Sequence, residues 1–174
     1  MVTWIKWTIW FCFSAIAVLV LLLTSLAIAK PSSALEVPSK DVVCMAEAIY
    51  YEARNQSSVG QLAVAIVIRN RMKDKRWPST ACGVVKDGRY WKGNPIRDKC
   101  QFSYWCDGKP ERFLEKDAWE RALNIAHLAY YHSIEIEDLM GATHYHTIWV
   151  QPSWAKKFRL STQIGDHRFY ESTQ

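Results

Sequence analysis

Residues 44–71 read CMAEAIYYEARNQSSVGQLAVAIVIRNR, and this stretch decides the fold. Its first half continues an apolar spacing typical of one helix face, and the residues on that face are Val42, Met45, Ile49 and Ala53. Asp41 is the expected N-cap of this first helix. Asn55 is expected to end the helix in a left-handed backbone conformation. The pattern therefore predicts a helix over about 41–54 with one buried face.

A second helix is predicted over residues 58–73, which are largely apolar and contain small alanines. Ser58 and Gln61 form an S-x-x-Q pattern, which is typical of a capping box at a helix start. Two helices joined by so short a turn form a hairpin that can hold one side chain rigidly. Glu52 borders the buried face of the first helix, so it is a candidate general acid. Glu47 is about 140° away around the helix, too far to form an acid pair with it.

The N-terminal part has the composition of a targeting segment. Residues 7–29 carry no charged side chain, and this run is long enough to span a bilayer. Residues 27–29 (AIA) also fit a signal-peptidase site. We expect residues 1–30 to be a signal anchor or signal peptide, residues 31–40 a linker and residues 41–174 the functional domain. That arrangement predicts an inner-membrane protein with its domain in the periplasm, or a periplasmic or secreted protein after cleavage.

The charge and the aromatic content indicate which classes of partner to expect. The formal net charge is +5, without any run of Lys or Arg and without a nucleic-acid-binding motif, so we expect no nucleic-acid partner. Nine Trp and eight Tyr favour either an aromatic core or a groove that stacks sugar rings. A long loop or short hairpin is predicted over residues 83–110, a helix over 117–132 capped by Asp117 and Glu120, and strands over 141–150 and 163–170.

Four cysteines lie in the predicted exported domain: Cys44, Cys82, Cys100 and Cys106. An even number of cysteines in an oxidising compartment favours two disulfides. Three pairings are conceivable. Cys100 and Cys106 flank a short loop and are the obvious local pair, which leaves Cys44 with Cys82. A zinc site and a catalytic cysteine are the rival interpretations.

Six blocks occur in an order that resembles a known family. They are YYEAR (50–54), GQLAVAIVIRNR (60–71), WPSTACGVV (77–85), CQFSYWCDG (100–108), GATHYH (141–146) and QIGDHRFY (163–170). Together they resemble the SleB/CwlJ-type cell-wall hydrolases, which include the spore-cortex-lytic enzymes, and the cysteine-bearing and THYH blocks resemble the Gram-negative branch. The resemblance implies an α+β fold, a helix-rich lysozyme-like domain with a small antiparallel sheet. It also implies cleavage of the glycan strand of peptidoglycan without a cofactor.

The family motif E-A-R-G-E carries the catalytic acid in its first position, which corresponds to Glu52. This chain has Asn55 and Gln56 where the motif has Gly and Glu. A single acid fits a lytic transglycosylase, in which one Glu first donates a proton and then accepts one. A muramidase-like hydrolysis would require a second carboxylate, for which Asp107 and Glu111 are candidates.

Other side chains are expected to contact the substrate. The expected set is Tyr51, Gln101, Ser103, Tyr104, Thr143, Tyr145 and His146. Two alternatives remain at this stage. The departure at Gln56 suggests an inactive peptidoglycan-binding protein, and a zinc-dependent amidase would use His144, His146 and His167, the first two of which share a face of a predicted strand.

Overall fold

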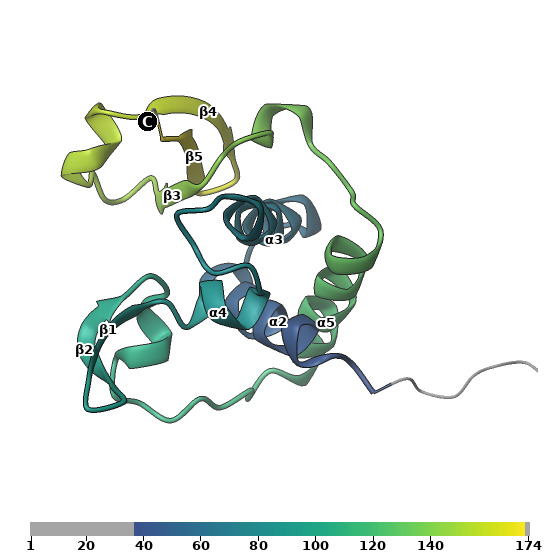
Figure 1. Cartoon of the computed structure of the whole chain (residues 1–174). Helices are drawn as coiled ribbons and strands as arrows, with labels where there is room; N and C mark the ends of the chain where they lie inside the picture. Colours follow the sequence, from purple (N-terminus) through teal and green to yellow (C-terminus); the bar gives the residue numbers. More distant parts are fainter. Residues whose placement is uncertain (1–36, 173–174) are drawn as a thin grey trace, which may run out of the picture. The chain divides into compact units, whose positions relative to one another are not determined.

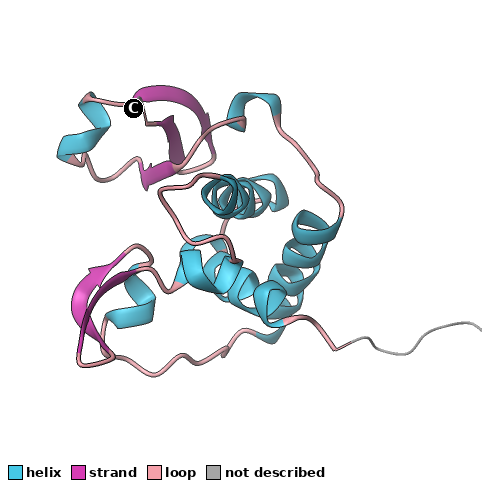
Figure 2. Ribbon diagram, viewed as in Figure 1, coloured by secondary structure: helices cyan, strands magenta, loops and turns pink. Residues whose placement is uncertain are grey.

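The computed structural model describes residues 37–172 (Figure 1). The segment predicted to be a signal anchor lies outside these residues, as does most of the predicted linker. Within residues 37–172, no helix combines the length and the apolar character needed to cross a membrane. The architecture of the described part is a set of packed helices with two small antiparallel sheets, as the colouring of Figure 2 shows.

The helical part consists of α2 (Lys40–Ala53), α3 (Ser58–Lys73), α4 (Ala81–Val85) and α5 (Lys116–Tyr131). Helix α2 packs against each of the other three. All four residues of its predicted apolar face are buried, and α5 turns Ala118, Ala122, Ala126 and Ala129 inward. Side chains this small let α5 pack closely against its neighbours. The predicted apolar face of α2 is therefore confirmed.

The predicted helix caps are wrong. Ser39 caps α2, since its hydroxyl accepts a hydrogen bond from the Val42 N–H. Ser57, one residue before the predicted Ser58, caps α3 by accepting from the Gly60 N–H. Helix α5 follows Glu115 without a side-chain cap, so Asp117 and Glu120 form no capping box. Adjacent polar residues offer the same cap chemistry, and the sequence does not say which of them the backbone selects.

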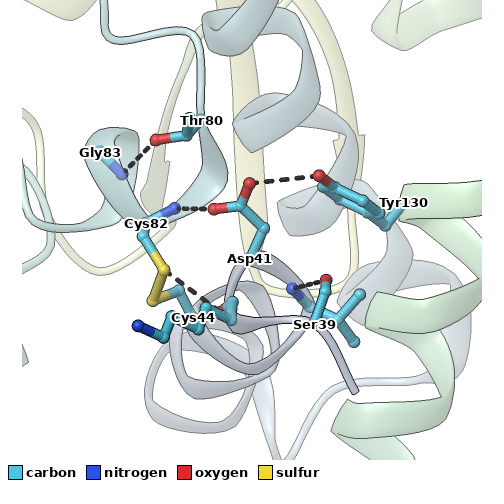
Figure 3. Close-up of a disulfide and its surroundings, with 9 residues drawn as sticks. Ser39, Asp41, Cys44, Thr80, Cys82, Gly83 and Tyr130 are labelled. Atoms are coloured by element: carbon cyan, nitrogen blue, oxygen red, sulfur yellow. Dashed lines mark hydrogen bonds between the residues drawn. A yellow bond between two sulfur atoms is a disulfide. The ribbon is translucent and has the colours of Figure 1, made fainter. Parts of the chain in front are cut away.

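Asp41 has a long-range role in place of the predicted cap (Figure 3). One carboxylate oxygen accepts a hydrogen bond from the Cys82 N–H at 2.9 Å, and the other accepts from the Tyr130 hydroxyl at 3.2 Å. Asp41 thus joins the start of α2 to α4 and to α5. The Cys44–Cys82 disulfide reinforces the same junction between α2 and α4.

The first sheet is a hairpin of β1 (Gly88–Trp91) and β2 (Asn94–Cys100). The short 3-10 helix η1 (Ser103–Cys106) follows, and the Cys100–Cys106 disulfide connects it to the end of β2. Both expected disulfides are therefore present. The predicted long loop or hairpin over 83–110 is confirmed as a hairpin followed by a short helical turn.

The second sheet has the order β3-β5-β4, with β3 (His144–Thr147), β4 (Arg159–Ile164) and β5 (His167–Glu171). Two short 3-10 helices, η2 (Glu137–Leu139) and η3 (Ser153–Lys156), lie in the connections. Phe169 on β5 is fully buried in a cluster with Ala63, Ile66 and Val67 of α3. The predicted strand over 163–170 is wrong, because Gly165 has a positive φ and turns the chain between two strands there.

Candidate active site

Glu52 lies in the last turn of α2, with its side chain partly buried. Its carboxylate accepts a hydrogen bond from the Tyr145 hydroxyl on β3. The neighbouring Arg54 pairs with Glu115 instead, at 2.8 Å between Nε and Oε1. Glu52 is therefore not the partner of an adjacent surface cation. It meets the second sheet at the junction of α2 and β3.

The surroundings of Glu52 favour its neutral form. Burial raises the pKa of the Glu52 carboxyl above its ordinary value, while the hydrogen bond from Tyr145 and the positive charge of Arg71 lower it. The burial effect is the largest of the three, so the pKa is raised overall. A carboxylic acid that holds its proton toward neutral pH can donate it to a leaving oxygen. Burial also raises the pKa of Tyr145 well above its ordinary value, so its hydroxyl keeps its proton.

Arg71 is a site residue that the sequence reasoning missed. Its guanidinium is buried between the rings of Trp77 and Phe102, at 5.5 and 5.6 Å from their centroids. Nε donates to the Thr143 carbonyl oxygen at 2.7 Å, which attaches the start of β3 to the end of α3. The charge acts on both Glu52 and Tyr145. An arginine inside a largely apolar predicted helix was the available signal, because a cation is buried only where something compensates it.

The rings of Tyr51 and Tyr104 form an aromatic wall beside Glu52. Tyr51 of α2 stacks on Tyr104 of η1, with ring centroids 4.4 Å apart and planes 17° from parallel. The Tyr104 hydroxyl is buried without a hydrogen-bond partner in the described part of the chain. Burial raises the pKa of Tyr104, and the charges of Glu47, Glu52 and Glu111 raise it further. The Tyr104 hydroxyl is thus a free hydrogen-bonding group close to Glu52.

Several other expected substrate contacts lie elsewhere. Tyr145 and His146 are consecutive on β3, so they face opposite sides of the sheet, and His146 stacks on Tyr170 and bonds to its hydroxyl at 2.9 Å. The Thr143 hydroxyl lies 3.0 Å from His144 Nδ1 and 3.3 Å from the Ser172 hydroxyl. Gln101 and Ser103 are exposed, and the Gln101 N–H donates to the Asp87 carbonyl oxygen, away from Glu52. Of the expected set, Tyr51, Tyr104 and Tyr145 gather around the acid.

The three histidines of the zinc alternative do not converge. His144 and His146 share one face of β3, as predicted, and both pack against Trp154. His167 is buried on the opposite face against Tyr145. Burial lowers the pKa of His144 to about 4, with Arg71 and Arg76 acting in the same direction. Across residues 37–172, no group of His, Cys, Asp or Glu side chains is arranged to hold a metal ion.

Gln56 has a structural role. Its amide nitrogen donates to Asp166 Oδ2 at 2.9 Å, and its amide oxygen accepts from the Asp166 backbone N–H at 3.1 Å. These paired bonds join the α2–α3 turn to the β4–β5 turn. The predicted left-handed stop at Asn55 is wrong, since Asn55 is not among the described residues with positive φ. The turn is held instead by Gln61, whose amide donates to the carbonyl oxygens of Arg54 and Gln56.

Comparison with known proteins identifies the class. The model of the cell wall hydrolase family matches residues 55–170, and the chain belongs to this family. The resemblance seen in the sequence blocks is thereby confirmed.

Relatives and solved structures agree with this assignment. The chain is 47% identical over 45 residues to a spore cortex-lytic enzyme of Halalkalibacterium halodurans, a match covering 26% of this chain and 14% of that protein. It is 42% identical over 60 residues to the enzyme of Oceanobacillus iheyensis, covering 29% of this chain and 22% of that protein. The matches therefore span less than a quarter of the length of these curated relatives.

The fold is that of a SleB catalytic domain. The catalytic domain of the germination-specific lytic transglycosylase SleB from Bacillus anthracis superposes with a TM-score of 0.57 and 24% identity, over 82% of this chain and 100% of that one. The catalytic domain of the Bacillus cereus SleB protein gives 0.55 and 23%, over 82% and 99%. The expected combination of helices with a small antiparallel sheet is confirmed. The expected N-terminal membrane helix lies outside the described residues.

Proposed function

We propose that this chain cleaves the glycan strands of peptidoglycan, with Glu52 as its general acid and base. The observation that carries the proposal is the setting of Glu52. Its side chain is partly buried, burial raises the pKa of its carboxyl group, and the Tyr145 hydroxyl donates a hydrogen bond to it. Membership of the cell wall hydrolase family supports peptidoglycan as the substrate.

The chemistry requires two proton transfers through one carboxyl group. Glu52 in its acid form donates its proton to the glycosidic oxygen as the bond to the sugar carbon breaks. The resulting carboxylate then takes the proton of the same sugar's 6-hydroxyl, whose oxygen bonds to that carbon. The product is an anhydro-sugar, no water is consumed, and Glu52 ends protonated as it began. Because the acid is regenerated in each cycle, no second carboxylate is needed.

The neighbours of Glu52 suit both halves of this cycle. Burial favours the protonated acid that begins the reaction, whereas Tyr145 and Arg71 stabilise the carboxylate that follows. Tyr51, which is partly exposed and stacks on the buried Tyr104, offers an aromatic surface to a bound saccharide. The hydroxyl of Tyr145 is proposed as a positioning group for the acid rather than as a separate acid.

Hydrolysis is the competing reaction, and it would use a second carboxylate to activate water. Glu47 and Glu111, the latter one of the two candidates named from the sequence, lie near the aromatic wall, since the charges of both act on Tyr104. Neither they nor Asp107, the other candidate, is among the groups that act on the pKa of Glu52. Burial raises the pKa of Glu47, and nearby Lys86 lowers it. Glu47 influences the titration of Tyr104 but not that of Glu52, which favours the reaction with a single acid.

Mass spectrometry of the fragments released from purified sacculi tests the proposal. The chain should release fragments about 18 Da, one water, lighter than the hydrolysed form. The Glu52→Gln variant should release none, while the matched Glu47→Gln variant on the same helix should retain the activity. Reducing ends together with loss of activity in Glu47→Gln would establish a hydrolase. Released peptides would point to an amidase, and a folded wild-type chain that binds sacculi without releasing fragments would establish an inactive binder.

A further inference from the structure

The β1–β2 hairpin has one packed face and one bare face. Tyr90 lies on the face toward Trp105 and is 44% exposed; its hydroxyl donates to the Lys86 carbonyl oxygen at 2.5 Å and accepts from the Trp105 indole at 3.1 Å. Trp91 is the next residue and points to the opposite face. Its side chain is 69% exposed, and Ile96 on the neighbouring strand is 39% exposed. An indole exposed to this extent at a hairpin tip contributes little to the packing of the fold.

The bare face is surrounded by positive charge. Between Gly88 and Cys100 the chain has four cationic side chains and one carboxylate, that of Asp98. Arg89, Lys92 and Lys99 form no ion pair within the described residues, and the only pairing in the hairpin is a loose contact of 3.9 Å between Arg97 and Asp98. Lys92 lies with its ammonium 5.9 Å from the centre of the Trp91 ring. This surface is therefore suited to a ligand that combines apolar ring faces with carboxylates.

The hairpin is rigidly connected to the wall of the active site. Its two-residue turn, Lys92–Gly93, has positive φ at both positions, as in the tight turns that suit a twisted hairpin. Its far end is joined to η1 by the Cys100–Cys106 disulfide. Helix η1 carries Tyr104, which stacks on Tyr51 one residue before Glu52. A polymer bound beside Glu52 can therefore continue onto a surface that is fixed relative to the acid.

We infer that the outer face of the β1–β2 hairpin binds the glycan strand of peptidoglycan outside the cleavage position, an inference that rests on the proposed function. The Trp91 indole stacks on one sugar ring. Arg89 and Lys92 pair with carboxylates of the peptides attached to the strand. This outer face, with Trp91, Arg89 and Lys92, is a platform for the strand. It gives the enzyme a preference for polymeric strands over short fragments, because only a strand long enough to reach from Glu52 to Trp91 gains both contacts.

The composition of this face favours a glycan over a lipid surface. A single exposed indole matches one pyranose ring, and its neighbours at the tip, Lys92 and Asn94, are polar. Binding to a membrane interface relies on a larger continuous apolar face inserted among the acyl chains. An anionic membrane would attract the same cations, so it serves as the contrasting ligand in the test.

The binding measurement uses the full-length Glu52→Gln protein in a mild non-ionic detergent, so that the substrate stays intact. Co-sedimentation with sacculi gives its dissociation constant. Adding Trp91→Ala should weaken binding roughly two- to tenfold, the range expected for one aromatic stacking contact. Replacing Arg89 and Lys92 by Gln should weaken binding and reduce its dependence on salt. Tyr131→Ala is the matched control, since Tyr131 is an exposed aromatic residue on α5, which lies away from the hairpin in Figure 1.

Two results would overturn the inference. One is unchanged binding to sacculi by the Trp91→Ala protein, with circular dichroism showing that it is folded. The other is Trp91-dependent binding to phosphatidylglycerol vesicles combined with Trp91-independent binding to sacculi. Failure of the proposed function looks different. If the wild-type chain released no fragments but bound sacculi through Trp91, the inferred binding role of the hairpin would stand and the catalytic assignment of Glu52 would be wrong.

Discussion

The Tyr145 hydroxyl donates a hydrogen bond to the Glu52 carboxylate and thereby connects β3 to the end of α2. The two residues are far apart in sequence and belong to different layers of the fold. Arg71 of α3 stabilises this contact. Its charge acts on both the Glu52 carboxyl and the Tyr145 hydroxyl, and its Nε donates to the Thr143 carbonyl oxygen just before β3. The proposed acid, Glu52, is therefore positioned by a contact between the helical part and the second sheet.

Tyr145→Phe should shift the pH dependence of cleavage. The lost hydrogen bond normally stabilises the carboxylate, so its removal raises the pKa of Glu52 further. The alkaline limb of the pH–rate profile, where the acid loses its proton, should move to higher pH. A hydrogen bond to a charged group contributes about 1.5–3 kcal/mol, so kcat/KM should fall roughly ten- to a hundredfold. A lower rate with an unmoved alkaline limb would contradict the assigned contact.

Glu52→Gln should stabilise the fold at neutral pH. Because the folded-state pKa of Glu52 is raised, ionisation of this carboxyl disfavours the folded protein. The penalty is absent below the ordinary pKa of Glu, grows as the pH passes through the folded-state pKa, and is constant above it. Gln does not titrate and resembles the protonated acid. Urea unfolding over a pH series should show that the free energy of unfolding of the variant increases relative to that of the wild type as the pH rises. A difference that does not change with pH would contradict the raised pKa of Glu52.

The sequence predicted the helices well, because the buried apolar residues of a helix recur in the sequence at the helical period. The apolar spacing from Val42 to Ala53 identified the face of α2 that is buried. The caps were predicted less well. Ser57 and Ser58 are chemically equivalent, and Asp41 is occupied by partners from Cys82 and Tyr130 that are distant in sequence. Local patterns do not report such long-range competition for a side chain.

The site was predicted only in part for a related reason. Glu52 was chosen as the candidate acid from its place on the helix and from the family blocks, and alternation on β3 correctly placed His144 and His146 on one face. Alternation does not say which face of a strand meets the acid, so Tyr145 and His146 were both expected there. The role of Arg71 depends on the packing of Trp77, Phe102 and β3 around it. That packing has no signature in a single segment of sequence.

Gln56→Glu should destabilise this chain although Glu occupies the corresponding place in the family motif. The amide of Gln56 donates to the Asp166 carboxylate, and a Glu there would place two carboxylates together. We expect a loss of about 1–3 kcal/mol in the free energy of unfolding at neutral pH. Adding Asp166→Asn should recover part of the loss, since an amide can donate to the new carboxylate. Additive effects in this double-mutant cycle, measured by urea unfolding, would show that the two residues do not interact.

The two disulfides should differ in what their removal affects. Cys44–Cys82 closes a loop with a sequence separation of 38, so replacing both residues by Ala should cost roughly 3–4 kcal/mol of stability. Cys100–Cys106 spans only 6 residues, so its removal should cost less, roughly 2 kcal/mol. That second disulfide fixes η1, however, and η1 positions Tyr104 against Tyr51 beside the acid.

The double variant Cys100→Ala, Cys106→Ala should therefore lose more activity on sacculi than Cys44→Ala, Cys82→Ala does at a temperature where both are folded. Urea unfolding and fragment release, measured on the same preparations, separate the two effects. The contrast follows from where each bridge lies: one joins helices of the core, and the other joins the aromatic wall to the hairpin. Equal loss of activity in the two variants would mean that η1 keeps its position without the bridge, and that the core packing alone orients Tyr104.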